Sequence, residues 1–140
     1  DMNGGFSALK DAYKTDVYEL SKWRNINYNK LYLGPKSFVV PLNSINKEPS
    51  AELNLNQKDQ DNLPPYEVLD EILKNIIEDE ASLEDIIKLG HDRQLVHRIY
   101  RLLLLSEYKR RQSAPGVKLT ARSFGKERRY PITNAFLRDK

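Results

Sequence analysis

The sequence predicts a mostly α-helical fold with little strand, and two observations lead to this expectation. Apolar residues between positions 64 and 105 recur at the spacing of a helix face. Only residues 37–42 have the character of a strand, and Pro41 would confine that strand to a sheet edge or end it there. With 140 residues, 39% hydrophobic and 31% charged, the chain is long enough for one globular domain.

The sequence of the first third of the chain predicts a turn, a helix and a loop. Gly4 and Gly5 let the backbone turn sharply or approach a ligand closely. Apolar residues between positions 17 and 23 indicate a helix that begins near Lys14 or Thr15. Residues 43–62 are polar and have no helical or strand period, so we expect a mobile loop.

Two helices are expected next. The first follows Pro64-Pro65, because proline is tolerated in a first helical turn, and it carries one continuous apolar face. Ser82 is typical of an N-cap, with Asp85 standing where a glutamate is more usual. The second helix should therefore start after Ser82 and end at Gly90.

A third helix and a tail complete the chain. Asp92 is expected to cap a helix whose apolar residues, between 95 and 105, cover enough of its circumference to predict burial from several sides. Residues 114–116, Ala-Pro-Gly, should stop it. Residues 113–140 then form a basic, extended tail without an amphipathic period.

Composition excludes several classes of site. The absence of cysteine excludes a disulfide framework, a thiolate nucleophile and Cys-ligated zinc. With only His91 and His97, a histidine metal site is not expected either, so any metal should be oxygen-bound Mg²⁺ that arrives with a nucleotide. No segment has the length of a membrane span, residues 1–25 lack the layout of a signal peptide, and a cytoplasmic setting is expected.

Charge is divided unevenly along the chain. Residues 48–85 are mainly acidic, whereas residues 109–140 carry ten lysines and arginines against Glu127 and Asp139. This asymmetry indicates either an anionic partner for the last third or a charge-complementary contact between the two halves.

The strongest concentration of charge is Glu107-Tyr108-Lys109-Arg110-Arg111-Gln112, which follows the third apolar helix. Such a run is more often a solvated helix end, favoured by the helix dipole, than a ligand clamp. Basic side chains held there are nevertheless well placed to bind a phosphate or carboxylate.

Together with Pro49-Ser50-Ala51-Glu52-Leu53, Asp59-Gln60-Asp61 and Leu63-Pro64-Pro65-Tyr66, this run resembles the C-terminal part of the NAD synthetases. The segment Arg128-Arg129-Tyr130-Pro131 resembles the larger, glutamine-dependent type. The resemblance implies an α/β fold of the adenine-nucleotide alpha-hydrolase-like, Rossmann-like class. In this portion of it, helices should outnumber strands because most of the parallel sheet lies upstream.

The resemblance also implies binding roles. Lys109 and Tyr108 match the positions that contact deamido-NAD, with Arg110 supporting the same anionic surroundings. Asp1 and Asn3, with the glycines that follow them, match a turn that lines the nicotinate pocket.

Lys14 and Ser50 match positions that contact ATP. Glu52 and Asp61 could help hold Mg²⁺, although a solvated charge is the more common state for each. Ser7 departs from the family pattern, because it stands where ammonia-dependent members carry a substrate-binding aspartate.

The implied reaction of the intact enzyme is the amidation of deamido-NAD to NAD, with ATP, Mg²⁺ and ammonia derived from glutamine, through an adenylylated intermediate. The chain contains neither the Ser-Gly-Gly-x-Asp-Ser loop that cradles pyrophosphate in this family nor a cysteine for an amidase. We therefore expect an inactive piece of a larger enzyme that forms a homodimer or higher homo-oligomer and binds neither nucleic acid nor membrane.

Two alternatives remain at this point. Residues 82–112 also have the outline of a helix-turn-helix DNA-binding module, but the helix that would enter the groove carries mainly apolar residues where base contacts need polar ones. The segment could instead serve as a non-catalytic assembly module.

Overall fold

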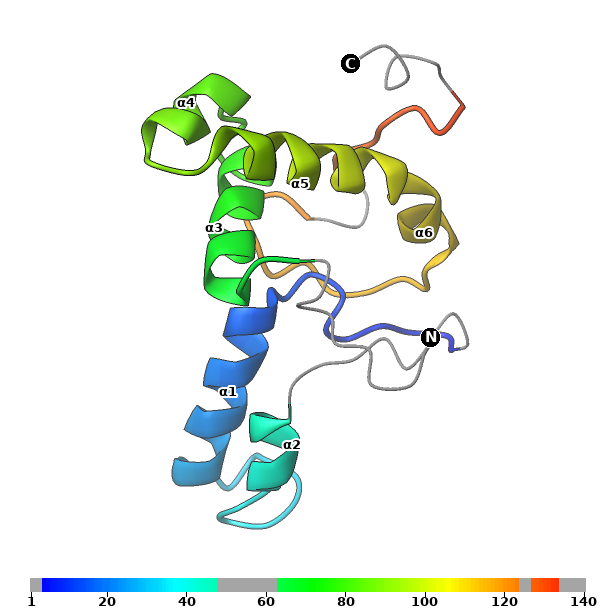
Figure 1. Ribbon diagram of the computed structural model, residues 1–140. Helices are drawn as coiled ribbons and strands as arrows, with labels where there is room; N and C mark the ends of the chain where they lie inside the picture. The colour runs from blue at the N-terminus through cyan, green and yellow to red at the C-terminus, as the bar shows by residue number, and fades with distance from the viewer. Residues whose placement is uncertain (1–3, 48–62, 124–126, 134–140) are drawn as a thin grey trace, which may run out of the picture. The chain divides into compact units, whose positions relative to one another are not determined.

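The computed structural model describes residues 4–47, 63–123 and 127–133 (Figure 1). These residues form six α-helices: α1 (Lys14–Ile26), α2 (Leu42–Asn46), α3 (Tyr66–Ile77), α4 (Leu83–Lys88), α5 (Arg93–Leu105) and α6 (Glu107–Gln112). They divide into two compact units, residues 13–68 and residues 1–12 with 69–140, which we call the α1–α2 unit and the α4–α6 unit. Most of α3 belongs to the second.

The α1–α2 unit is held together around a buried asparagine at the end of α1. The Asn25 side-chain amide donates to the Val40 carbonyl at 2.8 Å, and its oxygen accepts from the Val40 N–H at 2.9 Å. Asn25 and Ile45 of α2 are both buried, and α1 contacts α2. The expected start of α1 near Lys14 is confirmed.

The predicted strand at residues 37–42 is wrong. Phe38 adopts a φ of 49°, outside the extended region, and Pro41 is the N-cap of α2. Both backbone hydrogen-bonding groups of Val40 are satisfied by Asn25, so this residue needs no partner from a neighbouring strand. Residues 43–46 of the expected loop belong to α2 instead, and residues 48–62 lie outside the described part of the chain.

The core of the α4–α6 unit comes from three helices. Its buried apolar side chains are Ile72, Ile76, Ile77, Ile86, Val96, Ile99 and Leu103, from α3, α4 and α5. Within α5 the buried residues repeat at helical spacing on one face. The expectation that α5 is buried from several sides is wrong for this chain, because Leu102 and Leu105 are 42% and 52% exposed.

The predicted helix caps are confirmed. The Ser82 hydroxyl accepts from the Asp85 N–H at 3.2 Å, and the Asp92 carboxylate accepts from the Leu95 N–H at 2.8 Å. Gly90 has a φ of 107°, the left-handed conformation that ends a helix without cost only at glycine. These caps set the bend between α4 and α5.

The basic tail packs back onto the end of α3. Arg122 forms an ion pair with Glu80, the Ala121 N–H donates to Glu78 at 3.3 Å, and Arg128 donates to the Ile76 carbonyl. Residues 113–123 and 127–133 contain neither helix nor strand. Of the two interpretations of the uneven charge, a complementary contact within the chain is therefore observed.

Candidate functional site: the basic helix α6

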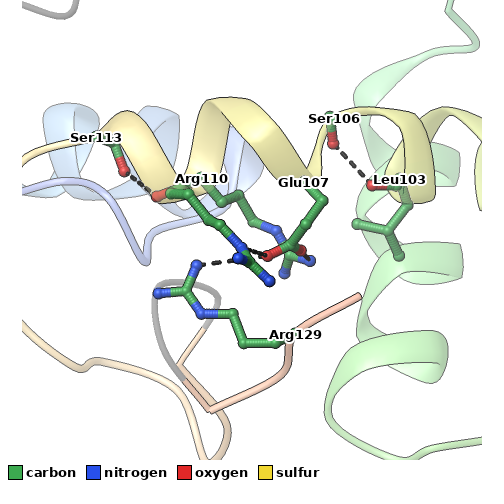
Figure 2. Close-up of polar contacts among 7 residues, drawn as sticks. Leu103, Ser106, Glu107, Arg110, Ser113 and Arg129 are labelled. Atoms are coloured by element: carbon green, nitrogen blue, oxygen red, sulfur yellow. Dashed lines mark hydrogen bonds and ion pairs between the residues drawn. The ribbon is translucent and has the colours of Figure 1, made fainter. Parts of the chain in front are cut away.

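The candidate site is built on α6, which starts where α5 stops. The Ser106 hydroxyl donates to the Leu103 carbonyl at 2.9 Å, and the Ser113 hydroxyl donates to the Arg110 carbonyl at 2.8 Å (Figure 2). These bonds satisfy carbonyl groups at the ends of α5 and α6 that have no helical partner. In the six-residue helix between them, Glu107 and Arg110 are buried, whereas Tyr108 and Lys109 are exposed.

Glu107 is the centre of a buried ion network. Its carboxylate pairs with Arg110, and it accepts from Arg111 Nε and from Arg129 Nη1 at 3.4 Å each. Figure 2 shows Arg110 of α6 and Arg129 of the tail converging on this carboxylate. Burial alone would raise the pKa of Glu107, but the charge of Arg110 and the backbone N–H of Tyr130 hold that pKa below its usual value.

Tyr130 extends the network into the tail. The guanidinium groups of Arg110 and Arg128 each lie 5.4 Å from the centroid of its ring. Burial raises the pKa of the Tyr130 hydroxyl, and the charge of Arg128 opposes that rise. Arg110 is directed inward and pairs with the Glu107 carboxylate, and its expected support of an anion beside Lys109 stays a prediction.

Within the described part of the basic run, residues 109–123 and 127–129, Lys109 differs from its neighbours. The other cations of this run have polar partners: Arg110, Arg111 and Arg129 pair with Glu107, Lys118 with Glu127, Arg122 with Glu80, and Arg128 with the Ile76 carbonyl. Lys109 Nζ instead lies 6.0 Å from the centroid of the Tyr108 ring, and Tyr108 is 45% exposed. The structure thus leaves an exposed ammonium group beside an exposed aromatic ring.

The N-terminal segment is bound to the chain that follows α6. The Ser7 N–H donates to the Pro115 carbonyl at 2.8 Å, and Lys10 Nζ donates to the Ala114 carbonyl at 3.0 Å. Asp11 Oδ2 accepts from the N–H groups of Leu119 and Thr120 at 2.7 and 2.9 Å. Residues more than 100 positions apart in sequence therefore lie side by side.

The remaining predicted residues are placed only in part. Gly4 and Gly5 are exposed, whereas Asp1, Asn3 and Ser50 lie outside the described residues, as do Glu52 and Asp61. Lys14 is exposed at the first residue of α1, in the other compact unit.

Two further properties of the described residues bear on function. No three His, Asp or Glu side chains among them gather as a metal ion would require. No helix among them is both long and apolar enough to cross a membrane.

Two buried carboxylates that support the site, Glu107 and Asp11, are not predicted from the sequence. Glu107 was treated as part of a basic run, although its spacing of three and four residues from Arg110 and Arg111 is that of intrahelical ion pairs. Asp11 was not singled out at all, because its partners lie 108 and 109 residues away.

Comparisons with known proteins identify the family. The NAD synthase family model matches residues 1–113. Glutamine-dependent NAD(+) synthetases from Rhodobacter capsulatus and Xanthomonas campestris are 51% and 49% identical over 96% and 97% of this chain. The matches cover 24% and 23% of those two relatives, so the chain spans about a quarter of their length.

A solved structure points the same way. The glutamine-dependent NAD+ synthetase from Acinetobacter baumannii, in complex with ADP, is 41% identical over 96% of this chain and 22% of that chain, with a TM-score of 0.51. None of these matches supports the helix-turn-helix alternative. The chain belongs to the NAD synthase family, and nearly all of it aligns with glutamine-dependent members.

Proposed function

We propose that this chain is the C-terminal part of the ligase region of a glutamine-dependent NAD synthetase. The whole enzyme would amidate deamido-NAD to NAD with ATP and with ammonia released from glutamine. Lys109 would contact an anionic group of deamido-NAD, with Tyr108 beside it. The family match over residues 1–113 and the relatives at 51% and 49% identity support the assignment of the chain. The role of Lys109 rests on its exposed ammonium, set in a basic run whose other described cations have polar partners.

A single exposed ammonium group, that of Lys109, is complementary to the negative charge of deamido-NAD. Deamido-NAD carries a pyrophosphate and a carboxylate, and a lysine ammonium is a compact point charge that donates charge-assisted hydrogen bonds to such groups. A neighbouring aromatic face adds a surface on which a planar ring can lie. Arg110 and Arg111 are paired with the Glu107 carboxylate, so they do not compete with Lys109 for an anionic ligand.

The chemistry requires two displacements. The nicotinate carboxylate attacks the α-phosphorus of ATP and releases pyrophosphate; ammonia then attacks the acyl carbon and releases AMP, leaving the amide. Positioning the two anionic substrates would supply most of the rate gain in such a reaction. The part that we assign to this chain is binding, because its sequence contains no phosphate-cradling loop.

The nucleotide side of the site is proposed for Lys14 and Ser50. Lys14 stands at the N-terminus of the thirteen-residue helix α1, where the helix dipole favours an anion. The Acinetobacter baumannii relative was solved with ADP, which supports nucleotide binding in the family. Glu52 and Asp61, the carboxylates that could help hold Mg²⁺, lie outside the described residues, so we assign no step to the ion.

We also propose the architecture of the whole enzyme. Its ligase region would have the Rossmann-like α/β fold, with the parallel sheet supplied by sequence outside this chain. Asp1 and Asn3 would line the nicotinate pocket. The enzyme would assemble as a homodimer or higher homo-oligomer.

The test is a substitution at Lys109 in the full-length enzyme that contains this chain. Lys109→Ala should cost about 1.5 to 3 kcal/mol of deamido-NAD binding, the range for a hydrogen bond to a charged group. The KM for deamido-NAD should therefore rise by about tenfold or more, while the KM for ATP changes little. Steady-state kinetics with each substrate varied in turn would measure both.

Lys118→Ala is the matched control, because Lys118 is an exposed lysine of the same basic run but pairs with Glu127 at 2.6 Å. It should leave both KM values within about twofold of the parent enzyme, because an exposed ion pair contributes little. Equal kinetics for the Lys109 variant and the parent would refute the assignment of Lys109.

A further inference from the structure

The contact between the N-terminal segment and the chain after α6 is unusually close. We call it the clamp, formed by residues 7–11 on one side and 114–120 on the other. Gly116 lies so near the N-terminal segment that a Cβ on it would stand 2.3 Å from the Ser7 carbonyl oxygen and 2.9 Å from Lys10 Cβ. Neither distance is compatible with a real side chain, so only glycine fits unless a backbone moves.

The other end of the clamp is a buried carboxylate. Asp11 is 4% exposed, and its Oδ2 accepts from the Leu119 N–H, the Thr120 N–H and the Thr120 hydroxyl at 2.7 to 2.9 Å. Hydrogen bonds from backbone N–H groups to an ionised carboxylate are short and strong. Asp11 therefore fixes the direction of residues 119–120. Gly116 allows the two sides of the clamp to approach closely near Ser7 and Lys10.

The clamp lies a few residues from both proposed parts of the dinucleotide site. On one side, Gly5 precedes Ser7 by two positions; on the other, Lys109 stands on α6, whose C-cap Ser113 leads directly into Ala114. The clamp is therefore joined to both parts by short stretches of chain, two positions from Gly5 to Ser7 and five from Lys109 to Ala114.

We propose that Asp11 and Gly116 are positioning residues for the dinucleotide substrate. The clamp sets the distance between the Gly4-Gly5 turn and Lys109, so that one molecule of deamido-NAD can contact both. This inference rests on the proposed function. It adds two residues that act through others and do not touch the substrate.

The experiment uses the full-length enzyme with Gly116→Ala and, separately, Asp11→Asn. Each should raise the KM for deamido-NAD about tenfold, since a displacement of about 1 Å in a positioned site is costly. The KM for ATP and the turnover number at saturating deamido-NAD should stay within about twofold. Val117→Ala is the matched control, because Val117 lies in the same stretch of chain and its side chain is 41% exposed.

The outcomes separate the clamp from the proposed function. If Lys109→Ala raises the KM for deamido-NAD and the clamp variants do not, the clamp is only structural and this inference is wrong. If the clamp variants alter both KM values and turnover together, or only lower the unfolding temperature, it is wrong as well. If Lys109→Ala leaves the KM for deamido-NAD unchanged, the proposed role of Lys109 is wrong. The inference about the clamp, which rests on that role, is then wrong with it.

Discussion

At the scale of single residues, the buried carboxylate of Glu107 organises the basic helix. It lies at the centre of three arginines, and only 1% of its side chain is exposed. Removing one partner of a buried ion pair leaves the other charges uncompensated, which typically costs about 3 to 5 kcal/mol. Glu107 should therefore matter more for stability than any charge on the exposed face of α6.

This gives a prediction for pH. Because the folded-state pKa of Glu107 is lowered, its stabilising contribution is complete above the unfolded-state pKa of about 4.3 and is lost as pH falls through the lowered value. The difference in unfolding free energy between the parent and Glu107→Gln should be constant near neutral pH and shrink below about pH 4. Urea unfolding across that range would measure it.

Glu67→Gln serves as the control, since Glu67 is an exposed glutamate in the first turn of α3. Its substitution should change stability by less than about 0.5 kcal/mol at every pH. A difference for Glu107→Gln that grows on acidification would contradict the sign derived from the lowered pKa.

At the scale of elements, the end of α1 depends on Asn25. The Asn25 side-chain amide donates to the Val40 carbonyl and accepts from the Val40 N–H, as the backbone of a neighbouring strand would. Asn25→Ala should therefore leave two backbone groups without their partner and destabilise the α1–α2 unit by about 2 kcal/mol. Thermal unfolding followed by circular dichroism would show the loss, whereas Asn43→Ala, an exposed position in the first turn of α2, should change little. Equal unfolding temperatures for the two variants would contradict the role of Asn25.

The same elements show what sequence could and could not predict. Caps at Ser82 and Asp92 were predictable because a capping side chain bonds to backbone only three residues away. The strand at residues 37–42 was mispredicted because its backbone partner is a side chain fifteen residues earlier. The role of Lys109 was predicted from the family resemblance. The pairing of Glu107 with Arg110 follows from their spacing along α6, but the contacts that Arg129 and Tyr130 make with this pair could not be predicted, because only the folded tail brings them near.

At the scale of the whole molecule, the chain spans about a quarter of the length of its relatives. Its sequence has no Ser-Gly-Gly-x-Asp-Ser loop to hold pyrophosphate. The isolated 140 residues should therefore form no NAD from deamido-NAD, ATP, Mg²⁺ and ammonia, while the full-length enzyme does so under the same conditions. Chromatographic detection of NAD would decide this.

The comparison needs a folded sample. Circular dichroism should show that the isolated chain is helical before its lack of turnover is attributed to the missing loop. Turnover by a purified chain of this length would overturn the assignment of phosphate binding to sequence outside it.

The pairing of the basic residues has a consequence for how the protein meets charged molecules from a distance. A cation in contact with its own carboxylate acts on distant ions as a dipole, as Lys118 does with Glu127 and Arg122 with Glu80, whereas Arg110, Arg111 and Arg129 share the single carboxylate of Glu107. At physiological ionic strength electrostatic attraction fades over about 8 Å, so this run acts mainly on anions that come close to it. A small ligand that brings its own negative charge next to Lys109 gains the full interaction. The basic run should therefore act on small anions at contact distance rather than on ions far from its surface.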